Sequence, residues 1–134
     1  MKLSTVKELE TAIKSARSRI EFLRAEASSI KSPPMDGLPR STGQASRVEV
    51  FAALIADEER RLAELYNEFD DKRIQLMTDI YRRVEGKAGE VLILRYVECL
   101  PHSEIAARLG YSLSNILQLH RRGKRAYESP HEEC

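Results

Sequence analysis

Residues 101–127 read PHSEIAARLGYSLSNILQLHRRGKRAY, and this stretch decides the fold of the C-terminal part of the chain. Pro101 is favoured in the first turn of a helix, so residues 102–109 are predicted to form a short helix. Gly110 follows where a helix end takes a left-handed residue, and Ser112 is suited to cap a second helix. Two short helices joined by a glycine-containing turn are typical of a helix-turn-helix motif.

The second helix of this motif, predicted over residues 113–127, has a buried side and an outward side. The core-facing residues of the two helices are expected to be Ile105, Ala106, Leu109, Ile116 and Leu119. The outward side would face a DNA major groove, where hydrogen-bonding and apolar side chains read base edges. The predicted base-facing residues are Leu113, Ser114, Leu117, Gln118 and Arg121.

Individual roles follow from the chemistry of these side chains. Gln118 can bond an adenine through two hydrogen bonds, and Leu113 or Leu117 can contact a thymine methyl group. Four cations are expected to contact mainly phosphates: Arg121, Arg122, Lys124 and Arg125. Cations near a helix end can also merely complement the helix dipole on a solvated face, and that alternative stays open here.

The formal net charge of +1 hides an uneven distribution along the 134 residues. Residues 1–86 carry 15 basic and 15 acidic side chains, residues 87–127 carry 7 and 3, and residues 128–134 carry no basic and 3 acidic side chains. The balanced total alone argues against a nucleic-acid-binding protein. Only the middle segment has the positive excess expected of a surface that meets phosphates.

The N-terminal part of the chain has the heptad pattern of a coiled-coil helix. A capping box of Thr5 and Glu8 predicts where this helix begins, and Ser32-Pro33-Pro34 predicts where it stops. Its apolar positions alternate in steps of three and four: Val6, Leu9, Ile13, Ala16, Ile20, Leu23, Ala27 and Ile30.

A loop and a second long helix are predicted next. Residues 32–46 hold three of the five prolines and two of the six glycines, so they are expected to form a loop. A second capping box, Ser46 with Glu49, predicts a helix that runs to about Val84. Its main stripe, apolar except for one glutamate, consists of Phe51, Ile55, Glu58, Leu62, Leu65, Phe69, Leu76 and Ile80. A weaker stripe consists of Val50, Leu54, Ile74, Met77, Tyr81 and Val84.

The two long helices are predicted to fold back as an antiparallel hairpin. Because such a hairpin buries little and the second helix is apolar on more than one side, we expect a homodimer or higher homo-oligomer. Two alternatives stay open: a helix of each chain pairs with another chain, or the weaker stripe packs only against the C-terminal domain. The fold class is therefore all-α, with a coiled-coil hairpin (residues 1–85), a helix-turn-helix domain (86–128) and an acidic tail (129–134).

Glycines interrupt the C-terminal part at two places. Gly86 and Gly89 separate the long helix from a short, mostly apolar helix that is predicted to end at about Leu100. Gly123 lies inside the last predicted helix, where glycine costs about 1 kcal/mol relative to alanine. We expect it to mark a bend or early fraying.

The sequence contains no pattern typical of an enzyme or a metal site. The P-loop, the dinucleotide-binding motif and the nucleophile elbow do not occur. The nucleophile and soft-ligand candidates lack the spacing of a four-ligand zinc site: they are Cys99, His102, His120, His131 and Cys134. Cys99 falls in the short predicted helix, and His120 is expected to cap or pack in the last helix. We expect no catalysis, no cofactor and no metal.

Hydropathy and cysteine content predict the cellular compartment of the protein. Charges break the apolar stretches every three or four residues, and the N-terminus lacks the apolar region of a signal peptide. Two cysteines do not form the disulfide framework of a small secreted domain. We therefore expect a cytoplasmic protein without a membrane span and with reduced thiols.

Residues 92–128 resemble a known group of DNA-binding domains. The resemblance rests on four segments in this order: Leu94-Arg95-Tyr96, Glu104-Ile105-Ala106, Leu109-Gly110-Tyr111-Ser112 and Leu119-His120-Arg121. They are similar to region 4 of sigma-70-family factors. They are still more similar to small phage and prophage transcriptional regulators of the ArpU/RinA type. Three further features resemble this group: the N-terminal helix, the Pro/Gly loop and the beginning of the second helix at Val48-Glu49.

The resemblance implies control of phage genes, often late genes, by binding double-stranded promoter DNA in a bacterial host cell. RNA polymerase is a further candidate partner. Pro101 stands where such domains usually have a capping Ser or Thr, and Leu113 and Leu117 stand where sigma factors often have polar residues, which argues against a standard −35 element. The alternative hypothesis is a phage structural, adaptor or packaging protein, similar to small terminase subunits, that uses the hairpin for assembly.

Overall fold

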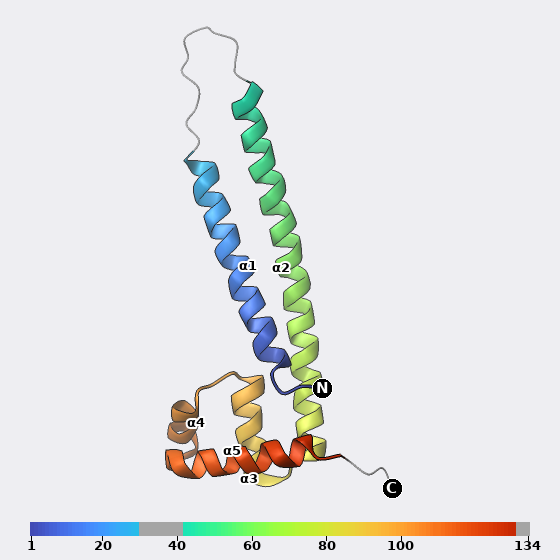
Figure 1. The fold of residues 1–134 in the computed structure, drawn as a ribbon, viewed down its shortest axis with the longest axis vertical. Coiled ribbons are helices and arrows are strands. Elements are labelled where there is room, and N and C mark those ends of the chain that lie inside the picture. Colours follow the sequence, from blue (N-terminus) through green and yellow to red (C-terminus); the bar gives the residue numbers. More distant parts are fainter. Residues whose placement is uncertain (30–41, 131–134) are drawn as a thin grey trace. The chain divides into compact units, whose positions relative to one another are not determined.

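The computed structural model describes residues 1–29 and 42–130, with the backbone alone for residues 42–46. All regular elements within these ranges are helical, which confirms the predicted all-α class. In chain order they are α1 (Thr5–Ser28), α2 (Thr42–Arg83), α3 (Gly86–Leu92), the π-helical turn η1 (Ile93–Val97), α4 (His102–Leu109) and α5 (Leu113–Glu128) (Figure 1).

The chain divides into two compact units, which are described separately. The hairpin unit is Thr11–Asn67, and the terminal unit joins Met1–Glu10 to Glu68–Cys134. The long helices α1 and α2 therefore each contribute to both units. The predicted domains, residues 1–85, 86–128 and 129–134, are defined as parts that fold independently. Their boundaries stay predictions.

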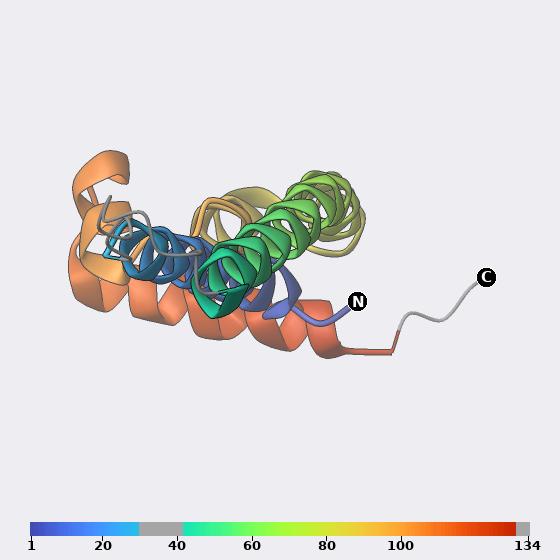
Figure 2. The same cartoon turned by 90° about the horizontal axis from the view of Figure 1, so that it is seen from above.

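In the hairpin unit, α1 and α2 run antiparallel and side by side (Figure 1, Figure 2). The α1 seam is confirmed here, because Ile13, Ala16 and Ile20 are buried. Beside the apolar contact, the Arg19 Nε donates to a Glu58 carboxylate oxygen at 3.2 Å. Glu58 is the one charged member of the main α2 stripe, so this ion pair explains how it is accommodated on the inner face.

The beginning of α1 differs from the prediction by one residue. The Ser4 carbonyl accepts a hydrogen bond from the Glu8 N–H at 2.9 Å, and the Ser4 hydroxyl donates to the Glu8 carboxylate at 3.2 Å. Because the carbonyl of a capping residue accepts the first helical hydrogen bond, Ser4 is the cap, and the predicted Thr5 cap is wrong. The predicted stop at Ser32-Pro33-Pro34 lies outside the described residues.

The beginning of α2 lies four residues before the predicted one. The helix starts at Thr42, so Ser46 lies inside it and the prediction of a loop as far as residue 46 is wrong. No proline separates these positions, and extending an existing helix gains one hydrogen bond for each residue that is fixed. The predicted loop residues up to 41 lie outside the described part of the chain.

The two apolar stripes of α2 have different surroundings. The main stripe is half-buried or buried along its whole length, as predicted. In the weaker stripe only Val84 is buried, at 5% exposure. The hypothesis that this stripe packs against the C-terminal domain is therefore wrong for Ile74, Met77 and Tyr81, which are exposed within the terminal unit.

The core of the terminal unit joins segments that are far apart in the sequence. Helix α5 packs against both α3 and α4, and the first turn of α1 and the end of α2 contribute further side chains. Its largest fully buried residues are Val6, Leu76, Ile80, Val91, Leu92, Val97, Ile105 and Ile116. This shared core fixes the position of the helix-turn-helix motif.

The segment before α4 is not the single short helix that the sequence predicts. After Leu92 the backbone widens into η1, in which the Glu98 N–H donates to the Ile93 carbonyl at 3.0 Å. Cys99 then adopts a φ of 58°, so its predicted helical position is wrong. The π turn brings Val97 into the core at 2% exposure, and Pro101 disfavours helical geometry in the residue before it.

The helix-turn-helix motif itself follows the sequence prediction closely. Gly110 ends α4 with a left-handed φ of 72°. The Ser112 hydroxyl accepts a hydrogen bond from the Asn115 N–H at 3.1 Å, and thereby caps α5. Pro101 provides no side-chain cap for α4, as its chemistry predicts.

Gly123 has a different role from the predicted one. Helix α5 continues beyond it to Glu128 and the glycine is buried, so the predicted bend or early fraying is wrong. A Cβ at Gly123 would lie 3.0 Å from the Ala88 carbonyl oxygen and 3.1 Å from the Leu92 Cγ. Gly123 is therefore the point at which α3 approaches α5 closely.

Candidate nucleic-acid interface

The five residues predicted to face DNA bases are all exposed on one side of α5. Leu113 is 49% exposed and Leu117 is 41% exposed, whereas the neighbouring Ile116 is fully buried. A solvated leucine pair on an otherwise polar face is available for an apolar contact. The other three outward residues, Ser114, Gln118 and Arg121, offer hydrogen-bonding groups.

The four predicted phosphate-contacting cations are also exposed. None of them has an ion-pair partner within residues 1–29 and 42–130. Arg121 and Arg122 lie before the last turn of α5, whereas the favourable effect of the helix dipole is confined to that turn. The dipole alternative therefore does not explain these two arginines.

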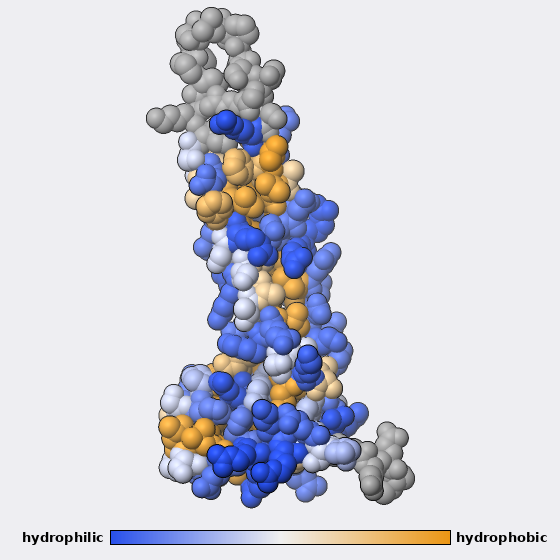
Figure 3. All heavy atoms as spheres, viewed as in Figure 1, coloured by the Kyte–Doolittle hydropathy of each residue, from blue (hydrophilic) through white to orange (hydrophobic). Residues whose placement is uncertain are grey.

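Polar and apolar surface separate along the helix-turn-helix. Figure 3 shows strongly hydrophilic surface over the C-terminal half of α5 and an apolar patch near its beginning. A shallow hollow follows the same side of the helix, lined by Leu117, His120, Arg121, Lys124, Arg125 and Glu128. The surface thus offers apolar and hydrogen-bonding groups next to concentrated positive charge.

His120 anchors α5 to the rest of the motif. Its Nε2 lies 2.7 Å from the Tyr96 hydroxyl of η1, and its ring meets the His102 ring of α4 edge-on at 4.7 Å. The predicted packing role of His120 is confirmed. Burial, with smaller contributions from nearby His102, Lys124 and Arg95, lowers the pKa of His120 to about 4. At neutral pH the imidazole is therefore uncharged.

Acidification should destabilise the terminal unit through His120. The native state keeps the imidazole neutral down to about pH 4, whereas an unfolded chain binds the proton near pH 6.5. Because the unfolded state binds more protons between these values, the free energy of unfolding should fall as the pH falls from about 6.5 towards 4. Urea unfolding at a series of pH values measures this loss.

His120→Gln is the control for this pH dependence. Glutamine keeps an acceptor for the Tyr96 hydroxyl but does not titrate in this range. The variant should therefore lose less stability than the unmodified protein between the same two pH values. An equal loss in both proteins would show that His120 is not the group responsible.

Tyr127 anchors the other end of α5. Its hydroxyl lies 2.6 Å from the Met1 carbonyl oxygen and 2.7 Å from the Asp79 Oδ2, so its single proton is donated to one of these two acceptors. The Arg83 guanidinium lies 5.1 Å from the ring centroid, and it also donates to the Tyr127 carbonyl at 3.4 Å. Burial, together with the hydrogen bond to Asp79, raises the pKa of Tyr127.

The sequence patterns described above do not identify Tyr127 as an anchoring residue. Tyr127 continues the spacing of the buried residues Ile116, Leu119 and Gly123, so the periodicity of α5 indicates that it faces inward. Its partners Met1 and Asp79 gave no comparable signal, because they lie far from it in the sequence.

The described ranges contain no cluster of three or more His, Cys, Asp or Glu side chains that would hold a metal ion.

The Cys99 Sγ lies 4.0 Å from the carbonyl oxygens of Tyr96 and Val97. Burial raises the pKa of Cys99 to about 11, so the thiol is protonated and weakly nucleophilic at neutral pH. His131 and Cys134 lie outside the described residues.

The geometry above is that of an exposed recognition helix held by a shared core. Residues 80–126 match the family model described as sigma-70, region 4. The matched segment covers the end of α2, all of α3, η1 and α4, and α5 as far as Ala126. Over these residues the chain is similar to sigma-70 region 4, which is a DNA-binding helix-turn-helix domain.

The chain as a whole matches no curated protein and no solved structure. Outside residues 80–126, the interpretation of the chain therefore depends on its own sequence and structure. None of the helices within the described ranges is both long enough and apolar enough to span a membrane.

Proposed function

We propose that this protein is a sequence-specific transcriptional regulator of phage or prophage genes that binds promoter DNA through α5. One observation carries the proposal: within a region 4 domain, the outward side of α5 combines exposed base-reading side chains with four cations that lack ion pairs within the described ranges. Such a face supplies both the base contacts that specify a sequence and the phosphate contacts that position the helix.

The proposal assigns different roles to neighbouring residues. Gln118 reads an adenine, and Leu113 and Leu117 contact thymine methyl groups. Arg122, Lys124 and Arg125 contact phosphates, and Arg121 and Ser114 lie at the edge of the bases.

Oligomerisation belongs to the same proposal. We infer that the chain acts as a dimer or higher oligomer in the host cytoplasm, with residues 1–85 as the assembling hairpin, residues 86–128 as the DNA-binding part and residues 129–134 as an acidic tail. The exposed side chains of Ile74, Met77 and Tyr81 support an interaction with protein. In a transcriptional regulator, the protein bound at this surface could be RNA polymerase. The same exposed side chains also favour the second candidate function, a phage adaptor or packaging protein.

Gln118→Ala and Arg122→Ala should separate base reading from phosphate binding. Loss of a base contact should reduce the preference for the specific site over random DNA by about 1 kcal/mol or more, equivalent to about fivefold or more. Loss of a phosphate contact should weaken binding to all sequences and lower the salt dependence. Titrations of labelled specific and random duplexes at several salt concentrations measure both effects. Identical behaviour of the two variants would contradict the division of roles.

Mapping of bound DNA across the host genome, followed by footprinting with purified protein, tests the function as a whole. The expected result is protection of defined sites upstream of phage genes. Equal protection of random DNA would overturn the regulatory proposal. Binding only to phage structural proteins would favour the second candidate.

A further inference from the structure

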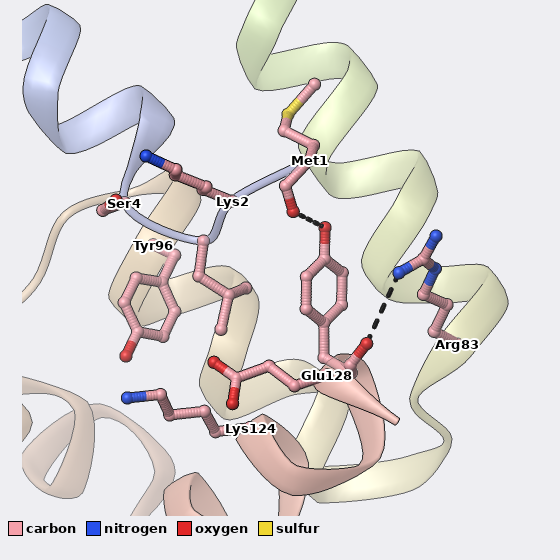
Figure 4. Close-up of a pocket in the computed structure, with 9 residues that line it drawn as sticks. Met1, Lys2, Ser4, Arg83, Tyr96, Lys124 and Glu128 are labelled. Carbon is pink, nitrogen blue, oxygen red and sulfur yellow. Dashed lines mark hydrogen bonds between the residues drawn. The ribbon is translucent and has the colours of Figure 1, made fainter. Parts of the chain in front are cut away.

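The segment from Met1 to Ser4 is fixed against the end of α5 (Figure 4). The Met1 carbonyl oxygen lies 2.6 Å from the Tyr127 hydroxyl, and the Lys2 carbonyl accepts a hydrogen bond from the Thr5 N–H at 3.2 Å. Leu3 is only 7% exposed. Lys2 thus lies between two anchored residues, and its backbone position is determined by the core of the terminal unit.

The side chain of Lys2 reaches the same hollow as a cation of α5. Lys2 and Lys124, with Tyr96 and Glu128, line a hollow of about 670 Å³ (Figure 4). Lys124 lies about one helical turn before Tyr127, so the position of Met1 beside Tyr127 allows Lys2 and Lys124 to line the same hollow, with their ammonium groups on different sides of it (Figure 4). Neither lysine has an ion-pair partner within the described ranges.

This hollow adjoins the predicted DNA-facing side of α5. Lys124 lines both it and the second hollow that contains Leu117 and Arg121. Positive charge from the beginning of the chain therefore continues the basic surface of the recognition helix. The carboxylate of Glu128 lines both hollows, so a small free anion held deep inside would be repelled. A DNA phosphate passing over the rim can meet the flexible lysine ammonium groups instead.

We propose that Lys2 contacts a DNA phosphate beside Lys124, which makes the N-terminal segment part of the DNA-binding surface. This inference rests on the proposed function. The backbone of the segment is already ordered in the free protein, so the contact costs little more than the rotamer freedom of one side chain. Each neutralised phosphate changes the slope of log affinity against log salt by about 0.9.

The test is Lys2→Gln in the full chain, measured by DNA titration between low and moderate salt. Binding to specific and random duplexes should weaken about threefold to tenfold at low salt, and the salt slope should fall by about 0.9. Lys124→Gln should behave in the same way. Lys72→Gln is the matched control, because it removes the same charge from a lysine that does not line the hollow. Glu128→Gln should strengthen binding to both duplexes.

The outcomes distinguish this inference from the proposed function. An unchanged salt slope in Lys2→Gln, together with a lower slope in Arg122→Ala, would overturn the role of Lys2 and leave α5 as the DNA-binding helix. An unchanged slope in all of these variants would overturn the proposed function itself. Thermal unfolding of Lys2→Gln should match that of the unmodified protein, because the side chain is exposed.

Discussion

Ile116→Ala should lower the free energy of unfolding by about 2–5 kcal/mol, the range for removing a large buried aliphatic side chain. Ile116 is fully buried in the core of the terminal unit, where α5 packs against α3 and α4. Because the backbone of these helices is fixed by many other contacts, the cavity can close only in part. Urea unfolding followed by circular dichroism measures the loss, and DNA binding should weaken as the folded fraction falls.

Leu117→Ala is the control one residue along the same helix. Leu117 is 41% exposed, so its stability should change by no more than about 0.5 kcal/mol. Its DNA affinity should fall selectively for sites that contain the contacted thymine, and replacing that thymine with uracil should remove the difference. If Leu117→Ala destabilised the protein as much as Ile116→Ala, the outward side of α5 would be wrongly assigned.

Gly89→Ala should destabilise the protein by about 1–3 kcal/mol, although alanine is the better helix former. A Cβ at Gly89 would lie 2.6 Å from the Val84 carbonyl oxygen, a distance that requires the backbone to move. Overpacking of this kind outweighs the gain of about 1 kcal/mol in helix propensity. Gly123→Ala should cost less, because its closest backbone neighbour, the Ala88 carbonyl oxygen, is 3.0 Å away and the Leu92 side chain can shift.

Gly86→Ala separates this packing effect from backbone strain. Gly86 has a φ of 70°, and apart from its own local backbone and its two chain neighbours no atom lies within 4 Å of the place that a Cβ would occupy there. Its substitution should therefore cost only the strain of a left-handed alanine, about 1 kcal/mol. Thermal or urea unfolding of the three variants compares them directly, and a stabilised Gly89→Ala protein would contradict the close approach.

The parts of the fold that follow local rules could be predicted from the sequence. Pro101, Gly110 and Ser112 each act on the backbone of their nearest neighbours, and the bounds of α4 and the beginning of α5 followed from them. The seam of α1 and the main stripe of α2 followed from periodicity alone. The exposed side of α5, and with it most of the candidate site, could be derived in the same way.

The remaining features depend on contacts that local patterns do not encode. The π turn of η1 forms because Val97 is drawn into a core built from other helices, and the short helix predicted there looked regular in sequence. Helix propensity alone predicts a bend or fraying at Gly123, and its close neighbour Ala88 lies in a different helix that local patterns do not connect to it. The contact of Tyr127 with Met1 joins residues that are 126 positions apart.

That last contact has a consequence for biosynthesis. Leu3 and Val6 leave the ribosome more than 120 residues before Tyr127, which belongs to the core that buries them. The nascent chain must therefore carry these apolar side chains unburied until Tyr127 has emerged, and such surface promotes aggregation. A message cut short before Tyr127 would yield a chain whose helix α5 is unanchored, so incomplete products should be good substrates for proteases.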